Sequence, residues 1–283
     1  MRYNKWKIRI KKSRKYLLLV PSLVVLLSLF ASLSMLLVIS FLDKDSFWAG
    51  DYRFTLQNYI IVLKQSYYVR LLLYTIVNSA LLSIVALILG YPFAYILARG
   101  KTKLKEFAQI ALVFPLYGWV YFCYGLVYIF LPRGIFNSIL MGLHLISEPI
   151  MLWQSRLFVL MALTLLSIPL VVLTIHSNIL GIDPIFEDAA RSLGANPIQV
   201  FLRITLPLSK TGIIGGTLIA FAINTGAFIV PLIVGGAKVD WLGVAMYLRM
   251  TYMMDWGVGA ALALVLFIVT LVSSYCYSVV LEK

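Results

Sequence analysis

The chain of 283 residues is 62% hydrophobic and 12% charged, and its formal net charge is +13. This composition excludes an ordinary soluble domain, in which about 25% of the residues are charged. Several apolar runs exceed the roughly 20 residues that are needed to cross a bilayer. The sequence therefore predicts a polytopic membrane protein.

We expect an all-α integral membrane protein with six transmembrane helices and both termini in the cytoplasm. The predicted spans are 17–42, 71–98, 107–131, 157–180, 208–234 and 257–280. With this topology sixteen basic residues lie in cytoplasmic segments and eight lie outside, as the positive-inside rule requires. The net charge is therefore interpreted as a determinant of topology on lipid headgroups, and no nucleic acid is expected as a partner.

Two units are expected along the chain. Residues 1–70 hold a basic tail, the first span and an outer amphipathic segment, and residues 71–283 hold the core of the bundle. In the outer segment Thr55 can cap a short helix with its apolar side chains on one face. A second interfacial helix is predicted from Ile135 onward.

The third span is unusually aromatic. Pro115 should kink it, and the aromatic residues Tyr117, Trp119, Tyr121 and Tyr124 follow. Rings inside a bilayer can pack against neighbouring helices, or they can line a path and offer π faces to a cation or an amine. The residues alone leave both interpretations open.

The segment 183–207, between the fourth and fifth spans, is too polar to cross a bilayer and predicts two short helices. In the first, Asp183 caps a helix that begins at Pro184, where a missing N–H costs nothing. Gly194 would end this helix as a left-handed residue.

The second short helix would begin after Asn196, with Gln199 as its capping-box partner, and would stop at Pro207. Such a pair of helices outside the bilayer can be a docking element for another protein or an ordinary loop with helical content. Both interpretations stand at this point.

The fifth span combines small and polar residues. Its first half holds three glycines that permit close helix contact, namely Gly212, Gly215 and Gly216. Further along, a polar patch broken by glycine could form a binding or gating site in the middle of the membrane. The candidate residues of a translocation path are Asn224, Thr225 and Phe228, together with Tyr117, Trp119, Tyr121 and Tyr124.

No acidic residue lies deep in a predicted span, which argues against a carrier driven by protons or sodium ions. The sequence contains no phosphate-binding G-x-x-x-x-G-K-[ST] loop. Cys123 and Cys276 have no metal-ligand spacing. We therefore expect no catalytic residue, metal site or bound cofactor in this chain.

Within 183–207 the order Asp188-Ala189-Ala190, three residues, Gly194, nine residues, Ile204-Thr205-Leu206-Pro207 resembles the EAA loop of ABC-importer permeases. Asp188 stands where that family has Glu, and Glu187 precedes it. The resemblance implies a coupling-helix pair that sits in a groove of a cytoplasmic ATPase. The coupling residues it implies are Glu187, Asp188, Ala189, Ala190, Gly194, Ile204, Leu206 and Pro207.

Shorter motifs, such as Leu89-Gly90-Tyr91-Pro92-Phe93-Ala94 and Asp255-Trp256, resemble the spermidine/putrescine branch of these permeases. The resemblance implies a non-catalytic subunit of a bacterial inner membrane importer that moves a small solute. The best match for this solute is a polyamine. Its implied partners are an extracytoplasmic binding protein, a second related permease and two ATPase subunits that bind ATP and Mg. Another solute (organophosphonate, iron or sulfate) remains an alternative, and a secondary carrier is disfavoured.

Overall fold

The structure, a computed structural model, describes residues 20–44, 50–100 and 104–282. The predicted basic tail, Arg2 to Lys15, lies outside the described residues. Regular structure in the described part is helical, apart from one isolated bridge between Leu42 and Phe54. The helices are α2 (Val20–Ser40), α4 (Gln57–Lys64), α5 (Ser66–Arg99), α6 (Leu104–Tyr117), α7 (Trp119–Phe130), α8 (Ile135–Gly142), α9 (Arg156–Leu180), α10 (Ile185–Ser192), α11 (Pro197–Val200), η1 (Phe201–Thr205), α12 (Leu206–Leu208), α13 (Lys210–Thr225), α14 (Ile229–Gly235), η2 (Gly236–Lys238), α15 (Leu242–Thr251) and α16 (Trp256–Glu282).

Four of the predicted spans are confirmed as single helices. They are α2, α5, α9 and α16. Within the described residues, five helical stretches are long and apolar enough to cross a membrane: these four and Trp119–Gly142. A sixth is added if Pro197–Leu208 and Lys210–Thr225, which meet at 66°, are counted as one span.

The third predicted span, 107–131, is wrong as a single helix. α6 ends at Tyr117 and α7 begins at Trp119, with Gly118 between them outside the helical conformation (φ −149°, ψ 55°). Pro115, the predicted kink site, stays inside α6, and the break follows at Gly118. The chain turns at the glycine, which lacks the Cβ that restricts other residues.

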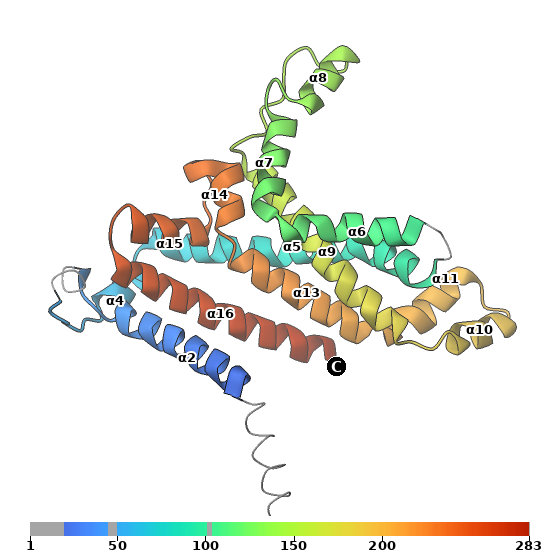
Figure 1. The fold of residues 1–283 in the computed structure, drawn as a ribbon, viewed down its shortest axis with the longest axis horizontal. Coiled ribbons are helices and arrows are strands. Elements are labelled where there is room, and N and C mark those ends of the chain that lie inside the picture. Colours follow the sequence, from blue (N-terminus) through green and yellow to red (C-terminus); the bar gives the residue numbers. More distant parts are fainter. Residues whose placement is uncertain (1–19, 45–49, 101–103, 283) are drawn as a thin grey trace, which may run out of the picture.

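The fifth predicted span, 208–234, is likewise wrong as a single helix. α13 ends at Thr225, residues 226–228 are not helical, and α14 follows in a new direction (Figure 1). One of the last carbonyls of α13 is satisfied from outside the helix. The backbone oxygen of Asn224 accepts from the N–H of Ala227 and from the indole N–H of Trp241, both at 3.3 Å.

α5, α9 and α13 pack against one another at the centre of the molecule (Figure 1). On α13, a Cβ added at Gly212 would lie 2.6 Å from the Cβ of Asn178, and one at Gly216 would lie 3.3 Å from the Cα of Val171. Both neighbours belong to α9. The predicted role of these two glycines in close helix contact is therefore confirmed.

The two predicted amphipathic helices are present as α4 and α8. The backbone N–H of Gln57 donates to the hydroxyl of Thr55 at 3.1 Å at the start of α4. The buried amide of Asn58 then donates to the carbonyl oxygens of Ser40 and Leu42, which fixes α4 to the end of α2. α14 and α15 are not anticipated by the sequence analysis.

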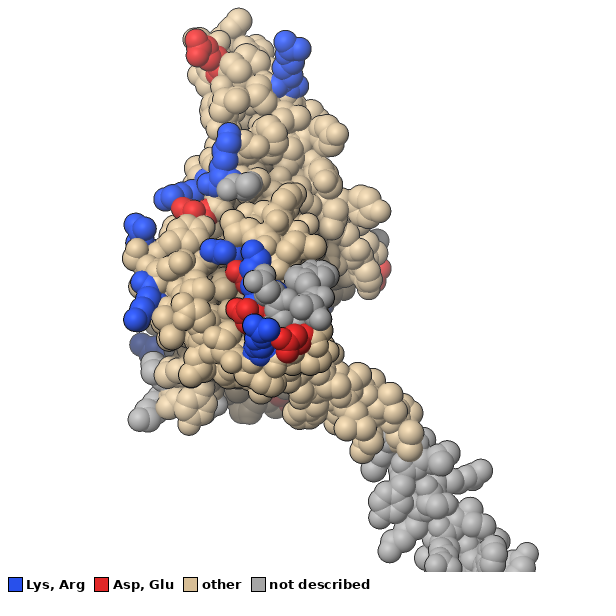
Figure 2. Space-filling view, turned by 90° about the vertical axis from the view of Figure 1, so that its left-hand side faces the viewer, with Lys and Arg blue, Asp and Glu red and all other residues tan. Residues whose placement is uncertain are grey.

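Ion pairs lie at both ends of the bundle. Figure 1 shows α10 and α11 at one end of the long axis and α4 and α15 at the other. Figure 2 looks at the end with α4 and α15, where charged side chains gather, including the ion pairs of Arg53 with Asp51 and of Arg249 with Asp255. α2 carries no charged side chain between these ends, as a lipid-facing helix requires.

Candidate functional site

The first of the two loop helices is α10, which begins at Ile185, one residue after the predicted start at Pro184, and its predicted end at Gly194 is confirmed. The carboxylate of Asp183 accepts a hydrogen bond from the backbone N–H of Ile185 at 3.0 Å. Gly194 takes the left-handed conformation with φ +87°. The N–H of Ala195 donates to the carbonyl of Ala190 at 3.0 Å, which satisfies a carbonyl at the helix end.

The second loop helix starts with the predicted capping box. The N–H of Gln199 donates to Asn196 Oδ1 at 2.8 Å, and the N–H of Asn196 donates to Gln199 Oε1 at 3.0 Å. The predicted stop at Pro207 is wrong, because the helix continues to Leu208. The π-helical turn η1 comes just before the proline and gives its ring the room that a regular turn denies.

Glu187 fixes α10 to the end of α5. Its carboxylate is buried and accepts hydrogen bonds from Arg99 Nε at 3.0 Å and from the Thr205 hydroxyl at 3.1 Å. Arg99 also donates to the backbone oxygen of Ile182 at 2.8 Å. One carboxylate therefore joins α5, α10 and η1.

A second attachment joins the loop to α5. The ring of Phe201 packs edge-on against the rings of Tyr91 and Tyr95, with centroids 5.5 and 5.6 Å away. The hydroxyls of Tyr91 and Ser209 lie 2.7 Å apart and share a hydrogen bond. Because both attachments are buried or half-buried, the loop is held as a fixed extension of the bundle.

The coupling residues named from the sequence differ in exposure. Glu187 is buried, Ala190, Ile204 and Leu206 are half-buried, and Asp188, Ala189, Gly194 and Pro207 are exposed. Beside the exposed ones, the apolar side chains of Ile185, Leu193 and Ile198 are 64%, 89% and 69% exposed. Apolar surface left open in this way is typical of a contact site for another molecule.

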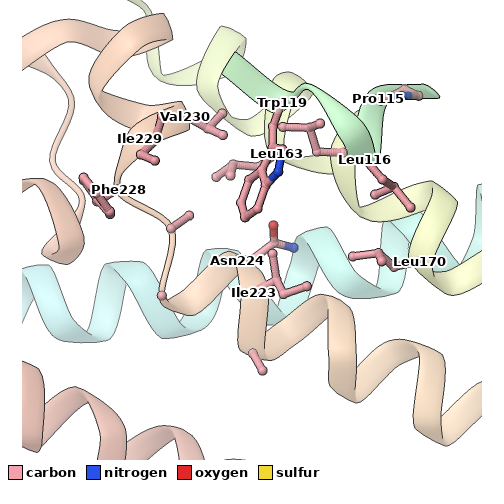
Figure 3. A pocket seen from close by; sticks show the side chains of 14 residues that line it. Pro115, Leu116, Trp119, Leu163, Leu170, Ile223, Asn224, Phe228, Ile229 and Val230 are labelled. Atoms are coloured by element: carbon pink, nitrogen blue, oxygen red, sulfur yellow. The ribbon is translucent and has the colours of Figure 1, made fainter. Parts of the chain in front are cut away.

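A cavity of about 470 Å³ lies where both broken helices turn, between α6 and α7, α9, and α13 and α14 (Figure 3). Its lining is formed by Pro115, Leu116, Trp119, Leu163, Leu166, Leu170, Ala222, Ile223, Asn224, Gly226, Ala227, Phe228, Ile229 and Val230. Non-helical backbone at membrane depth is typical of transporter binding sites. The volume falls within the range of small-molecule sites.

The cavity is almost wholly apolar, and its one side chain with an amide is Asn224. This residue is 1% exposed. Ser167 Oγ lies 3.0 Å from Asn224 Oδ1, and the amide nitrogen has no hydrogen-bond partner among the described residues. In Figure 3 the amide projects into the cavity below the ring of Trp119.

The structure brings three of the seven path candidates to this cavity, namely Trp119, Asn224 and Phe228. Thr225 is buried elsewhere and its hydroxyl donates to the backbone oxygen of Phe221 at 2.7 Å. Tyr117, Tyr121 and Tyr124 lie on the surface of α6 and α7, where they are 88%, 84% and 51% exposed. These three tyrosines do not line the cavity.

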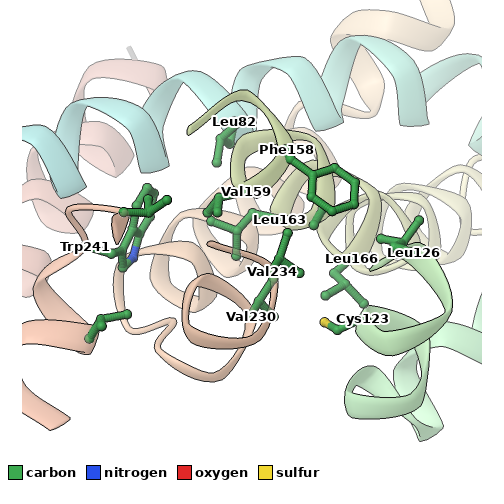
Figure 4. Close-up of a cluster of buried hydrophobic side chains, with 13 residues drawn as sticks. Leu82, Cys123, Leu126, Phe158, Val159, Leu163, Leu166, Val230, Val234 and Trp241 are labelled. Carbon is green, nitrogen blue, oxygen red and sulfur yellow. The ribbon is translucent and has the colours of Figure 1, made fainter. Parts of the chain in front are cut away.

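Behind the cavity lies a cluster of buried apolar residues (Figure 4). Leu163, Leu166 and Val230 belong both to the cluster and to the cavity lining. The cluster also includes Trp241, whose ring caps α13. Since packed interiors transmit displacement, the cavity wall is joined to the rest of the bundle core.

Sequence reasoning missed several of the residues that build these sites. Ser167 was not named as a candidate, although a serine two positions before a proline in a span is a polar signal that could have found it. Trp241 and Arg99 gave no signal, because their partners, Asn224 and Glu187, lie far away in the sequence.

Residues 86–282 match the family model described as "Binding-protein-dependent transport system inner membrane component". The chain belongs to this family. It is accordingly the permease subunit of an ABC importer and a multi-pass protein of the bacterial inner membrane.

This permease is 32% identical over 254 residues to the spermidine/putrescine transport system permease protein PotB of Escherichia coli, a match that covers 89% of the chain and 92% of PotB. It is 29% identical over 172 residues to the molybdenum transport system permease protein ModB of Mycobacterium tuberculosis, covering 59% and 62% of the two chains.

Among solved structures, this permease has the fold of a bacterial ABC transporter that imports alginate. The TM-score is 0.70 at 17% identity, and the match covers 99% of this chain and 98% of the other. The alginate transporter is also solved in complex with an alginate-bound periplasmic protein.

Proposed function

We propose that this permease moves a polyamine, such as spermidine or putrescine, from an extracytoplasmic binding protein into the cytoplasm. The observation that carries the substrate class is the 32% identity to a polyamine permease over 89% of the chain. The energy comes from ATP hydrolysed by two separate subunits that bind ATP and Mg. A second, related permease completes the path, and this chain supplies no catalytic residue.

The ATPase contact in this proposal is the outward face of α10 and α11. Ile185, Leu193 and Ile198 present open apolar side chains there. The ion pair of Arg191 with Asp188, at 3.0 Å, borders this surface. An apolar centre with a charged rim is the usual composition of a contact between two proteins.

Movement of the docked loop reaches the cavity through two rigid routes. Glu187 and Phe201 join the loop to α5. Pro197–Leu208 meets α13 at 66° at Ser209, and the far end of α13 carries Asn224. A shift of the loop with the ATPase pair therefore tilts the helix whose end lines the cavity, as a rigid-body transition requires.

The topology in this proposal has six spans, with both termini and the loop in the cytoplasm. The distribution of basic residues supports this orientation. Residues 71–283 then form the permease core, and residues 1–70 form a peripheral unit in which α2 packs along α16. Contact between the loop and a cytoplasmic ATPase is possible only in this orientation.

The surface of α6 and α7 is the proposed contact with the second permease. Phe107, Phe114, Tyr117 and Tyr121 expose most of their side chains there. Aromatic residues are enriched in contacts between proteins. This assignment gives the exposed tyrosines of the third predicted span a place outside the cavity.

An importer of the same architecture for another small solute is the second candidate. It is favoured by the likeness to a molybdenum permease, which extends over 59% of the chain. A secondary carrier has less support, because the cavity lining contains no acidic or basic side chain.

The proposal is tested by reconstituting the purified complex of both permeases and the ATPase in liposomes with its binding protein. We expect ATP-dependent uptake of labelled spermidine or putrescine. Uptake of molybdate, sulfate or a phosphonate in place of polyamines would contradict the substrate class. A complex that takes up polyamine without ATP would contradict the importer mechanism.

A matched pair of variants tests the docking face. Leu193→Asp should abolish copurification of the ATPase, because it places a charge at the centre of the proposed contact. Leu145→Asp, which changes a leucine that is 67% exposed in the segment after α8, should leave copurification unchanged. Equal ATPase yields from the two variants would contradict the docking assignment.

A further inference from the structure

The hydrogen bonds around Ser167 contain one more acceptor than its hydroxyl can serve. Ser167 Oγ lies 2.8 Å from the backbone oxygen of Leu163 and 3.0 Å from Asn224 Oδ1. A serine hydroxyl has a single hydrogen and can donate to only one of them. At the same time the amide nitrogen of Asn224 is buried without a partner, which is costly inside an apolar wall.

Exchanging the two ends of the Asn224 amide gives the amide nitrogen a partner and leaves the side-chain oxygen as the buried group without one. Ser167 then donates to the backbone oxygen of Leu163, and the Asn224 amide nitrogen donates to Ser167 Oγ. The carbonyl oxygen of the Asn224 side chain then takes the buried position of the nitrogen in the cavity lining. An amide oxygen and nitrogen differ little in shape, so the hydrogen-bond network decides their orientation.

The surroundings of this oxygen suit one chemical class of ligand. Trp119 presents its indole to the same cavity (Figure 3), and a tryptophan face is the best aromatic partner of an ammonium group. Leucine, isoleucine and valine side chains line most of the remaining surface. An acceptor, an indole and an apolar wall together match an alkylammonium, in which a cationic end joins a methylene chain.

We propose that Asn224 and Trp119 form a binding station for an alkylammonium end of the transported solute inside the membrane. The Asn224 side-chain oxygen accepts a hydrogen bond from the ammonium, the Trp119 ring lies against its charge, and the apolar wall contacts the methylene groups. This assignment rests on the proposed function, because it gives the polyamine a place in this chain.

The station carries no charge of its own, and such a site suits a transient binding step during transport. Among the described residues no acidic side chain lines the cavity, so the ammonium meets one neutral acceptor and one ring. A carboxylate there would hold the ligand more strongly, because hydrogen bonds between two charged groups are the stronger kind. Weak binding lets the solute leave toward the cytoplasm.

The test uses the reconstituted complex and measures spermidine uptake together with ATP hydrolysis at a saturating concentration of loaded binding protein. Asn224→Leu should lower the uptake rate about tenfold while ATP hydrolysis stimulated by the binding protein continues. Asn224→Asp should retain part of the uptake, because a carboxylate also accepts from an ammonium but releases it more slowly. The matched control is Asn78→Leu on α5, whose amide donates to the backbone of its own helix at Tyr74 and does not line the cavity.

If Asn224→Leu took up spermidine as fast as the unaltered complex, the station would be overturned and the proposed function would remain. Loss of uptake in both Asn224→Asp and Asn224→Leu, with normal assembly, would overturn the acceptor assignment and point to an amide N–H that binds an anion. If the unaltered complex takes up no polyamine, the proposed function itself fails.

A second pair of variants, at Trp119, tests the station if the complex with Asn224→Leu does not assemble. Trp119 is 51% exposed, so its replacement disturbs packing less. Trp119→Leu should lower spermidine uptake, and Trp119→Phe should retain most of it because a π face remains. Full uptake by Trp119→Leu would overturn the station.

Discussion

Glu187 precedes the acidic position of the loop motif, yet its side chain faces its own protein. The carboxylate is 3% exposed and pairs with Arg99, which is 17% exposed. Asp188 is the acidic side chain that remains in the open, 69% exposed. Neighbouring acids in one short helix therefore have different surroundings, because consecutive residues point about 100° apart around a helix.

Removing one partner of the buried pair should destabilise the loop strongly. In Glu187→Ala the guanidinium of Arg99 loses its partner, at a cost of roughly 3 kcal/mol. We expect the midpoint of thermal unfolding of the purified complex to fall by several degrees. The double variant Arg99→Met/Glu187→Met should recover most of the midpoint, because it removes the unpaired charge as well. A double variant as unstable as the single one would contradict this explanation.

Gly194 is needed for its backbone conformation. Its φ is +87°, and an added Cβ would meet nothing within 4 Å, so a substitution is strained although there is space for it. Gly194→Val should abolish transport by redirecting α11, with the permease still inserted in the membrane.

Gly194→Asn is the matched variant, since asparagine tolerates the left-handed region better than a β-branched residue. It should keep a measurable part of the uptake. If Gly194→Val took up solute as fast as the unaltered protein, the bend between α10 and α11 would not matter for transport.

At the scale of elements, the sequence predicts helix ends best where the residues that fix them are close in the sequence. Asp183, Gly194 and Asn196 mark the ends of the loop helices, since each cap acts on a backbone group within a few residues. The breaks at Gly118 and after Thr225 were not predictable in the same way. The first lies in an apolar run. The second lies in the polar patch broken by glycine, and its contact with Trp241 exists only in the folded chain.

The contact between α13 and α9 gives a prediction at this scale. A Cβ at Gly216 would lie 3.3 Å from backbone atoms of Val171, which cannot move aside as a side chain can. Gly216→Ala should therefore destabilise the permease by about 1–3 kcal/mol.

Gly215→Ala is the control, because its Cβ would meet only the methyl of Thr174 at an ordinary 3.5 Å. It should leave the thermal midpoint unchanged. Thermal unfolding of the two variants side by side gives the comparison, and equal midpoints would contradict the proposed closeness of the two helices.

For the whole molecule, the class and the family follow from patterns that need no folded structure. Long apolar runs indicate membrane spans, and the spacing from Asp188 to Pro207 indicates the permease loop. The cavity could be predicted only in part. Trp119, Asn224 and Phe228 were named as path residues, but Tyr117 and Tyr121 were placed with them, because aromatic content cannot tell which side of a helix faces a cavity.

The central claim is that residues 183–207 are a rigid cytoplasmic lever that the ATPase moves. Its attachments to α5 and its junction with α13 join one end of the molecule to the cavity at the break of the fifth predicted span. Such a lever can transmit movement only if another protein binds its outer face.

The most direct test is photo-crosslinking in intact cells from a benzoylphenylalanine placed at Leu193, which is 89% exposed. The account predicts an adduct between the permease and the ATPase subunit, identified by its mass and by mass spectrometry of its peptides. An adduct with the extracytoplasmic binding protein, or no protein adduct at all in a transporting complex, would contradict it.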